Sequence, residues 1–172
     1  LRSASMAEIA ARVLESAQSL TGSVFGFTGY MAPQTNYLTC PTHPQEIWEP
    51  FRVPTEVNTF NASEGLWGWA LENRQPMFTN ATENDPRVVD RLRGPFPIRR
   101  FLAVPALFGE ALVGLLALAN SERDYSERDQ ALIERLAALY ALAIQRKRAE
   151  EALQDSEQRY RNLFENAPLC MF

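Results

Sequence analysis

The chain has 172 residues, of which 17 are Lys or Arg and 21 are Asp or Glu, so its net charge is −4. A chain of this length with 46% hydrophobic residues buries enough surface to fold as one domain without disulfides or metal. The acidic balance disfavours nucleic-acid binding, and one His and two Cys exclude a His-rich metal site or a disulfide framework.

Lysine is nearly absent from the sequence. Lys147 is the only one, so the residues before it lack the lysine that a P-loop, a Schiff base or a kinase nucleotide site requires. The longest apolar runs, at 101–108 and 111–119, are too short to cross a bilayer. Because the chain opens without Met and stops within an apolar run, we expect a segment of a longer cytoplasmic protein, without membrane contact.

The N-terminal part is predicted to form one helix and two strands. Apolar side chains recur at three- and four-residue spacing over residues 6–20, which is typical of an amphipathic helix. A strand is predicted over residues 23–30, where alternation places Phe25 and Phe27 on one face. Residues 35–39 are predicted to form a second strand.

The middle of the chain is rich in proline. Residues 41–64 are predicted to be irregular, and Ser63 is predicted to cap a short helix. Residues 75–80 are predicted to form a strand. Asp85, which precedes a proline, is predicted to start a further helix that ends at Gly94.

The C-terminal part is predicted to form a hairpin and a long helix. Strands over 100–108 and 111–120 flank a Gly-Glu pair that is typical of a tight turn, and both of their faces are apolar. The Ser-x-x-Asp spacing from Ser126 predicts a helix that continues to about Asn166. Such a helix is about 60 Å long, so it must leave the globular body, and we place the domain boundary at 146–150.

The order and spacing of these elements resemble a GAF domain, over roughly residues 5–147. The stretches that carry the resemblance are 64–70, 75–78, 84–87, 100–107, 109–110, 113–120 and 125–129. The resemblance implies an α+β fold with a central antiparallel sheet of five to six strands. The terminal helices are expected on one face of this sheet and a small-molecule pocket on the other, with residues 1–147 as the sensor domain.

Residues 156–168 resemble the entry helix of a PAS domain, so 148–172 is predicted to be a coiled-coil linker helix and the beginning of that domain. A GAF domain followed by PAS implies a parent such as a sensor histidine kinase, with a cyclic-dinucleotide enzyme as the alternative. We expect no catalysis by this segment, because His43, its sole His, lies in a proline-rich loop instead of on a phosphoacceptor helix.

The motif from Cys40 to His43 raises the question of a metal or chromophore. The cysteine that carries bilin in related photoreceptors is followed by His, whereas Cys40 is followed by Pro41. We favour an ordinary thiol and imidazole over haem held by His43, and expect neither haem nor bilin. Cys170 lies far along the chain, so we predict no intramolecular disulfide and no methionine sulfoxide reductase activity.

The resemblance implies a pocket bordered by aromatic rings. Trp67 and Trp69 lie two residues apart, so at most one of them should reach the cavity. The guanidinium of Arg87 could bind an anionic ligand through two parallel hydrogen bonds, although a solvated arginine face is the favoured interpretation. For each aromatic ring, a plain role in the core stays open. The pocket candidates are Phe25, Phe27, Tyr37, Trp67, Trp69, Phe78, Asp85, Arg87 and Phe101.

The long helix also carries a seam with alternating spacings of four and three residues, which predicts a parallel homodimer joined by the terminal helices. Its apolar members are Leu132, Leu136, Leu139, Leu153, Tyr160 and Phe164. The expected function is to sense an unknown small molecule and to relay the signal to PAS or kinase domains of the same chain. The alternative is a ligand-free dimerisation scaffold.

Overall fold

The computed structural model describes residues 3–42, 59–61, 63, 65–89 and 97–166. Three α-helices, a short 3-10 helix (η2) and six strands are described within these ranges. They are α1 (Met6–Thr21), β1 (Ser23–Met31), β2 (Tyr37–Thr39), β3 (Thr59–Asn61), α3 (Gly68–Asn73), β4 (Met77–Thr79), η2 (Thr82–Asn84), β5 (Phe101–Phe108), β6 (Ala111–Ser121) and α4 (Glu127–Glu165).

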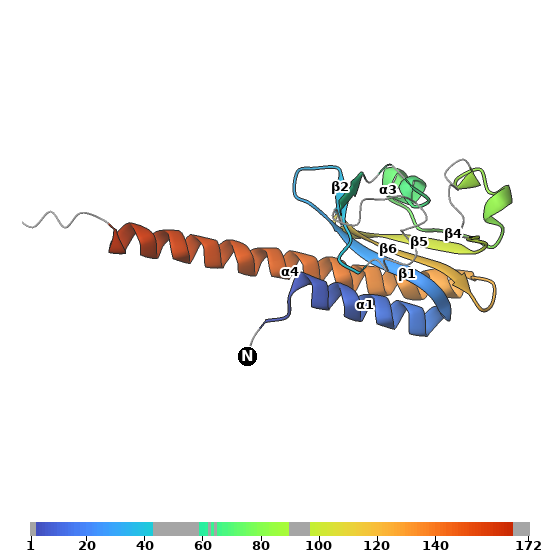
Figure 1. The fold of residues 1–172 in the computed structure, drawn as a ribbon, viewed down its shortest axis with the longest axis horizontal. Helices are drawn as coiled ribbons and strands as arrows, with labels where there is room; N and C mark the ends of the chain where they lie inside the picture. Colours follow the sequence, from blue (N-terminus) through green and yellow to red (C-terminus); the bar gives the residue numbers. More distant parts are fainter. Residues whose placement is uncertain (1–2, 43–58, 62, 64, 90–96, 167–172) are drawn as a thin grey trace, which may run out of the picture.

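The six strands form one antiparallel sheet in the order β3-β2-β1-β6-β5-β4. Helices α1 and α4 cover one face of the sheet, which we call the helix face (Figure 1). Helix α3 lies on the opposite face, which we call the outer face. The expected α+β fold is therefore confirmed, with β1 and β6 at the centre of the sheet.

Both faces of the sheet are buried, as the apolar hairpin predicted. The alternation of a strand sends Leu115 and Ala117 of β6 to the outer face and Leu116 and Leu118 to the helix face. The outer-face cluster comprises Phe27, Met31, Leu38, Cys40, Leu66, Trp67, Ala70, Leu71, Met77, Val88, Phe101, Ala103, Leu115, Ala117 and Ala119. The helix-face cluster comprises Ala10, Ala17, Leu102, Val104, Ala106, Val113, Leu116, Leu118, Tyr125, Ile133, Ala137, Tyr140, Ala141 and Ile144.

A glycine in β6 allows α4 to lie directly on the sheet. A Cβ at Gly114 would be 2.8 Å from the carbonyl oxygen of Gly29 and 3.0 Å from Cδ1 of Ile144. The ring of Tyr140, also on α4, would be 3.2 Å away. Because cores tolerate added methyl groups poorly, a side chain at this position would push α4 away from the sheet.

A capping box starts α4 and ties it to the preceding loop. The N–H of Asp129 donates to Ser126 Oγ at 3.4 Å, and the N–H of Ser126 donates to Asp129 Oδ2 at 2.9 Å. Arg123 makes two hydrogen bonds of 2.7 Å to the same carboxylate. These bonds from Arg123 are the main reason why the pKa of Asp129 lies below its usual value.

The helix α4 leaves the body of the domain (Figure 1). Its last fully buried residue is Ile144, and residues 151–166 are all exposed. At 39 residues it is about 58 Å long, as expected. The predicted domain boundary and PAS entry stay predictions, and residues 167–172 lie outside the described ranges.

Two local predictions in the middle of the chain were wrong. Ser63 does not cap a helix, because α3 starts after Trp67 and has no side-chain cap. Strand β3 forms at the end of the stretch predicted to be irregular, where the Asn36 amide donates to Asn61 Oδ1 and to Ser63 Oγ. This bridge between distant segments joins the turn before β2 to the end of β3, so local sequence patterns do not reveal it.

The helix predicted after Asp85 is described only at its start. The 3-10 helix η2 precedes Asp85, whose Oδ1 accepts the N–H of Arg87 at 2.9 Å, as expected of a cap. The chain then turns as far as Val89, and the predicted end at Gly94 lies outside the described residues.

The capping box makes a prediction about pH. Replacing Asp129 by Asn should lower the free energy of unfolding at pH 7 by about 1 kcal/mol, the usual cost of losing a helix cap. Because the pKa of Asp129 is lower in the folded protein, its ionised carboxylate stabilises the fold at any pH above the ordinary pKa of 3.8. This contribution is lost as the pH falls through the lowered pKa of the folded state. The difference between wild type and Asp129→Asn in urea denaturation should therefore shrink below pH 3.8.

Glu151→Gln, on the exposed part of α4, is the control and should change the free energy of unfolding little at either pH. A difference for Asp129→Asn that stays constant down to pH 2 would contradict the assignment.

Candidate ligand site on the outer face

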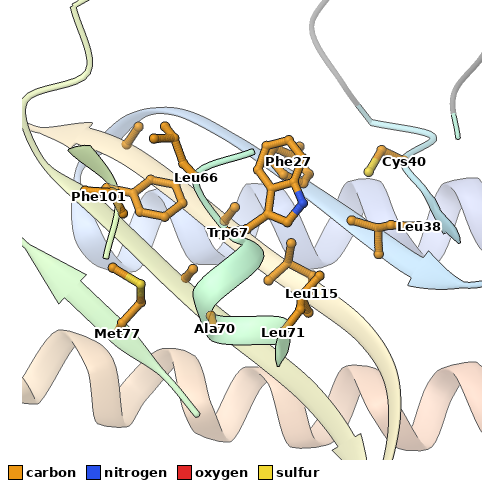
Figure 2. Close-up of a cluster of buried hydrophobic side chains, with 14 of the residues drawn as sticks. Phe27, Leu38, Cys40, Leu66, Trp67, Ala70, Leu71, Met77, Phe101 and Leu115 are labelled. Carbon is orange, nitrogen blue, oxygen red and sulfur yellow. The ribbon is translucent and has the colours of Figure 1, made fainter. Parts of the chain in front are cut away.

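The outer-face cluster is centred on two aromatic rings from different elements (Figure 2). Trp67, in the turn before α3, packs edge-on against Phe27 of β1, with ring centroids 4.9 Å apart at 78°. Phe101 of β5, Met77 of β4 and Leu115 of β6 lie beneath α3 in the same cluster. The centre of the sheet therefore presents an apolar floor, and α3 covers it.

Gly65 makes the turn before α3 possible. Its φ is +96°, a conformation that other residues rarely adopt, and the Trp67 ring folds back over it. A Cβ at Gly65 would be only 2.7 Å from Trp67 Cζ2. Gly65 thus positions the tryptophan against the sheet.

A charged pair lies beside this apolar floor. The Arg87 guanidinium donates from Nε to Asp85 Oδ1 at 3.0 Å and from Nη2 to Asp85 Oδ2 at 2.6 Å. Nη2 also donates to the Phe78 carbonyl at 3.1 Å, and the guanidinium lies 5.3 Å from the centre of the Trp69 ring. Arg87 is thereby held in place by an acid, a backbone oxygen and an aromatic face.

The pair has a clear electrostatic consequence. The hydrogen bonds from Arg87 lower the pKa of Asp85 to about 2, and Asp85 in turn raises the pKa of Arg87. The carboxylate therefore neutralises much of the arginine charge, and an anionic ligand would have to compete with Asp85 for the fork. Of the two other nearby arginines that the structure describes, Arg100 pairs with Asp124 at 2.7 Å and Arg99 is exposed. Arg91 and Arg93 lie outside the described residues.

Cys40 is fully buried in the outer-face cluster. Its Sγ lies 2.9 Å from the position of a Cβ built on Gly29, and desolvation raises the pKa of the thiol. A reactive cysteine is accessible and has a lowered pKa, so Cys40 has the properties of a core residue. His43 and Cys170 lie outside the described residues, and the disulfide prediction stays untested.

The structure brings most of the pocket candidates together. The gathered side chains are Phe25, Phe27, Trp67, Trp69, Asp85, Arg87 and Phe101. Trp67 is buried and Trp69 half-buried beside Arg87, so the two tryptophans do face different surroundings.

Two candidates lie elsewhere. Phe78 packs with the helix-face cluster, because its neighbours Met77 and Thr79 take the outward-facing positions of β4. Tyr37 is 53% exposed, and Leu38 occupies the inward position of β2 in its place. Both predictions were wrong about the face of a three-residue strand.

Several residues of the floor were missed by sequence reasoning. Met77, Leu38 and Leu115 border the aromatic rings but carry no chemical motif. Their only signal is the alternation of short strands, and this signal becomes usable only when the partner strand is known.

Comparison with known proteins identifies the family. Residues 3–145 match the sequence profile of the GAF domain, and the chain belongs to this family. The methyl sulfide methyltransferase-associated sensor of Methanosarcina acetivorans is 30% identical over 156 residues. These cover 87% of this chain and 15% of that protein, so the chain spans a small part of the relative.

Solved GAF domains share the fold. The GAF domain of an Acinetobacter phosphoenolpyruvate-protein phosphotransferase superposes with a TM-score of 0.66 at 17% identity, over 86% of each chain. The GAF domain of a two-component sensor histidine kinase from Bacillus halodurans gives 0.63 at 18% identity, over 87% of this chain and 99% of that one. The free methionine-R-sulfoxide reductase of Neisseria meningitidis, which is an enzyme, gives 0.60 at 14%, over 84% and 82%.

No helix within the described ranges combines the length and the apolar character needed to cross a membrane.

The charged pair makes a prediction about titration. Replacing Arg87 by Gln removes the hydrogen bonds that hold the Asp85 pKa at about 2, so this pKa should rise toward the ordinary value of 3.8. Carboxyl carbon NMR chemical shifts over pH 1.5–6 measure the change. Arg99→Gln, an exposed neighbour, is the control, and an equal rise in that variant would contradict a specific pair.

Proposed function

We propose that this chain is a non-catalytic sensor module in signal transduction. A small molecule binds over the apolar floor of the outer face, and α4 relays its presence to a PAS domain of the same chain, with a sensor histidine kinase as the parent. Membership of the GAF family and the relative described as a sensor support this proposal.

The observation that carries the proposal is the construction of β6. Leu115 belongs to the outer-face cluster, while its neighbours Gly114 and Leu116 lie against the helix layer. Tyr140 and Ile144 of α4 would meet a Cβ at Gly114 within 3.2 Å. A ligand that changes the packing of the outer-face cluster therefore acts on β6, and the opposite face of β6 contacts α4 directly.

A second contact ties α4 to the sheet near the point where the helix leaves the body. Arg148 donates from Nη2 to the carbonyl of Met31, at the end of β1. A ligand with different affinities for two positions of β1 and β6 shifts the population of the matching positions of α4. The relay needs only this differential binding.

The chemistry of the described residues supports a non-catalytic role. Cys40 is buried and its pKa is raised, unlike the accessible thiolate that catalysis by a cysteine requires. Within the described part of the chain, no three His, Cys, Asp or Glu side chains gather in a way that could hold a metal ion. We therefore propose binding without turnover, although the family also includes enzymes.

Ligand binding is tested by thermal shift and by mass spectrometry of small molecules released from the natively purified protein. The panel contains the released molecules, cyclic AMP, cyclic GMP and free methionine sulfoxide. One compound should raise the Tm of wild type, and Trp69→Ala should weaken its binding at least tenfold, because Trp69 is the half-buried ring beside Arg87. Tyr37→Ala, an exposed ring outside the cluster, should bind as wild type does.

A failure of every compound to shift the Tm, with nothing released, would contradict the sensor proposal. The ligand-free dimerisation scaffold would then be the better description, and exposed leucines on α4 favour it as the second candidate. Turnover of methionine sulfoxide would contradict the non-catalytic role. Visible absorbance of the purified protein, if present, would indicate a haem or bilin chromophore instead.

A further inference from the structure

The side chain of Trp67 fills the centre of the candidate ligand site. Figure 2 shows its ring in the middle of the outer-face cluster, and the residue is only 6% exposed. Phe27 and Leu115, on the central strands β1 and β6, are 7% and 0% exposed in the same cluster. Because the Trp67 ring already packs against Phe27, a small molecule that binds over the centre of the sheet has to take the place of this ring.

The turn that carries Trp67 lies between two glycines. Gly65 has a φ of +96°, and the N–H of Gly68 donates to the Gly65 carbonyl at 3.1 Å. Only Leu66 and Trp67 separate these glycines. Because glycine can move between backbone conformations that other residues rarely adopt, a rotation at Gly65 turns the Trp67 ring away from the sheet and leaves the strands in place.

The helix that follows Trp67 is short and weakly anchored at its start. Helix α3 has six residues, and its N-cap, Trp67 itself, makes no side-chain capping bond. Isolated helices of this length are marginal in water, so α3 can adjust when the ring moves. The bond from the Leu71 N–H to the Trp67 carbonyl, at 3.2 Å, is the backbone contact that such a movement breaks first.

We propose that Trp67 is a retractable plug, and that the ligand which displaces it is a flat aromatic molecule about the size of indole. This inference rests on the proposed ligand site of the outer face. The ring meets Phe27 at 78° with centroids 4.9 Å apart, in the edge-to-face arrangement that aromatic pairs prefer. An aromatic guest in the same volume recovers this contact, whereas an aliphatic guest of equal size does not.

A plug affects affinity in the opposite direction to a ring that stacks on a ligand. The apparent dissociation constant equals the intrinsic constant divided by the fraction of open protein. Removing the Trp67 ring therefore strengthens binding, whereas removing a stacking ring weakens it. Gly65→Ala should also open the site, because its Cβ would be 2.7 Å from Trp67 Cζ2 and would push the ring out.

The sign of this effect is measured by isothermal titration calorimetry with indole as the probe. Trp67→Ala and Gly65→Ala should each bind indole at least tenfold more tightly than wild type does. Gly109→Ala is the matched control, because Gly109 also has a positive φ, +61°, but no heavy atom lies within 4 Å of its Cβ position. This variant carries the same kind of backbone strain and should bind indole as wild type does.

Movement of the ring is measured by fluorine NMR of protein that contains 5-fluorotryptophan. The Trp67 resonance is assigned by its absence in Trp67→Phe. Indole should shift it in wild type toward its position in Gly65→Ala and increase its sensitivity to exchange of H2O for D2O. If wild type does not bind millimolar indole while Trp67→Ala does, Trp67 is a fixed core residue and the plug is overturned. This comparison decides the matter even if Gly65→Ala fails to fold.

The ligand class is tested with cyclooctanol, which has as many non-hydrogen atoms as indole but is neither flat nor aromatic. Trp67→Ala should bind cyclooctanol at least threefold more weakly than indole, and equal or tighter binding would overturn the aromatic class. A natural ligand that raises the Tm without moving the Trp67 resonance would overturn the plug and leave the sensor proposal intact. Opening by indole in a protein that has no natural ligand would give the reverse result.

Discussion

The close approach of α4 to β6 is the contact on which the rest of the structure depends. Gly114 supplies no side chain, and Tyr140 and Ile144 occupy the space that a Cβ would take. This contact fixes which side of α4 faces the sheet. Because a helix has only one opposite side, it also fixes which residues of the free half point away from the domain. The outer-face floor and the exposed side of α4 are thus joined by one strand and one helix.

Much of the fold could be predicted because its longest elements carry strong periodic signals. The helices from Met6 and from Glu127, and the hairpin between Phe101 and Ser121, were each anticipated within a few residues. The short elements were not, because β3 forms through the bond from Asn36 to Asn61, and α3 begins without a capping side chain. Such contacts between distant segments leave no local pattern in the sequence.

The candidate site was predictable in its chemistry but less so in its geometry. The aromatic rings and the Asp85–Arg87 pair were identified by type, and the structure does gather most of them. Tyr37 and Phe78 were assigned to the wrong face, since a strand of three residues has too few alternations to fix its register.

The two-faced construction of α4 bears on how a signal could leave the domain. Residues that touch the sheet, such as Tyr140, and exposed residues of the opposite side, such as Leu139 and Leu142, alternate within single turns of one helix. Because α4 is one continuous helix from Glu127 to Glu165, a rotation or shift that follows repacking of the sheet moves its exposed side by the same amount, without any intervening hinge.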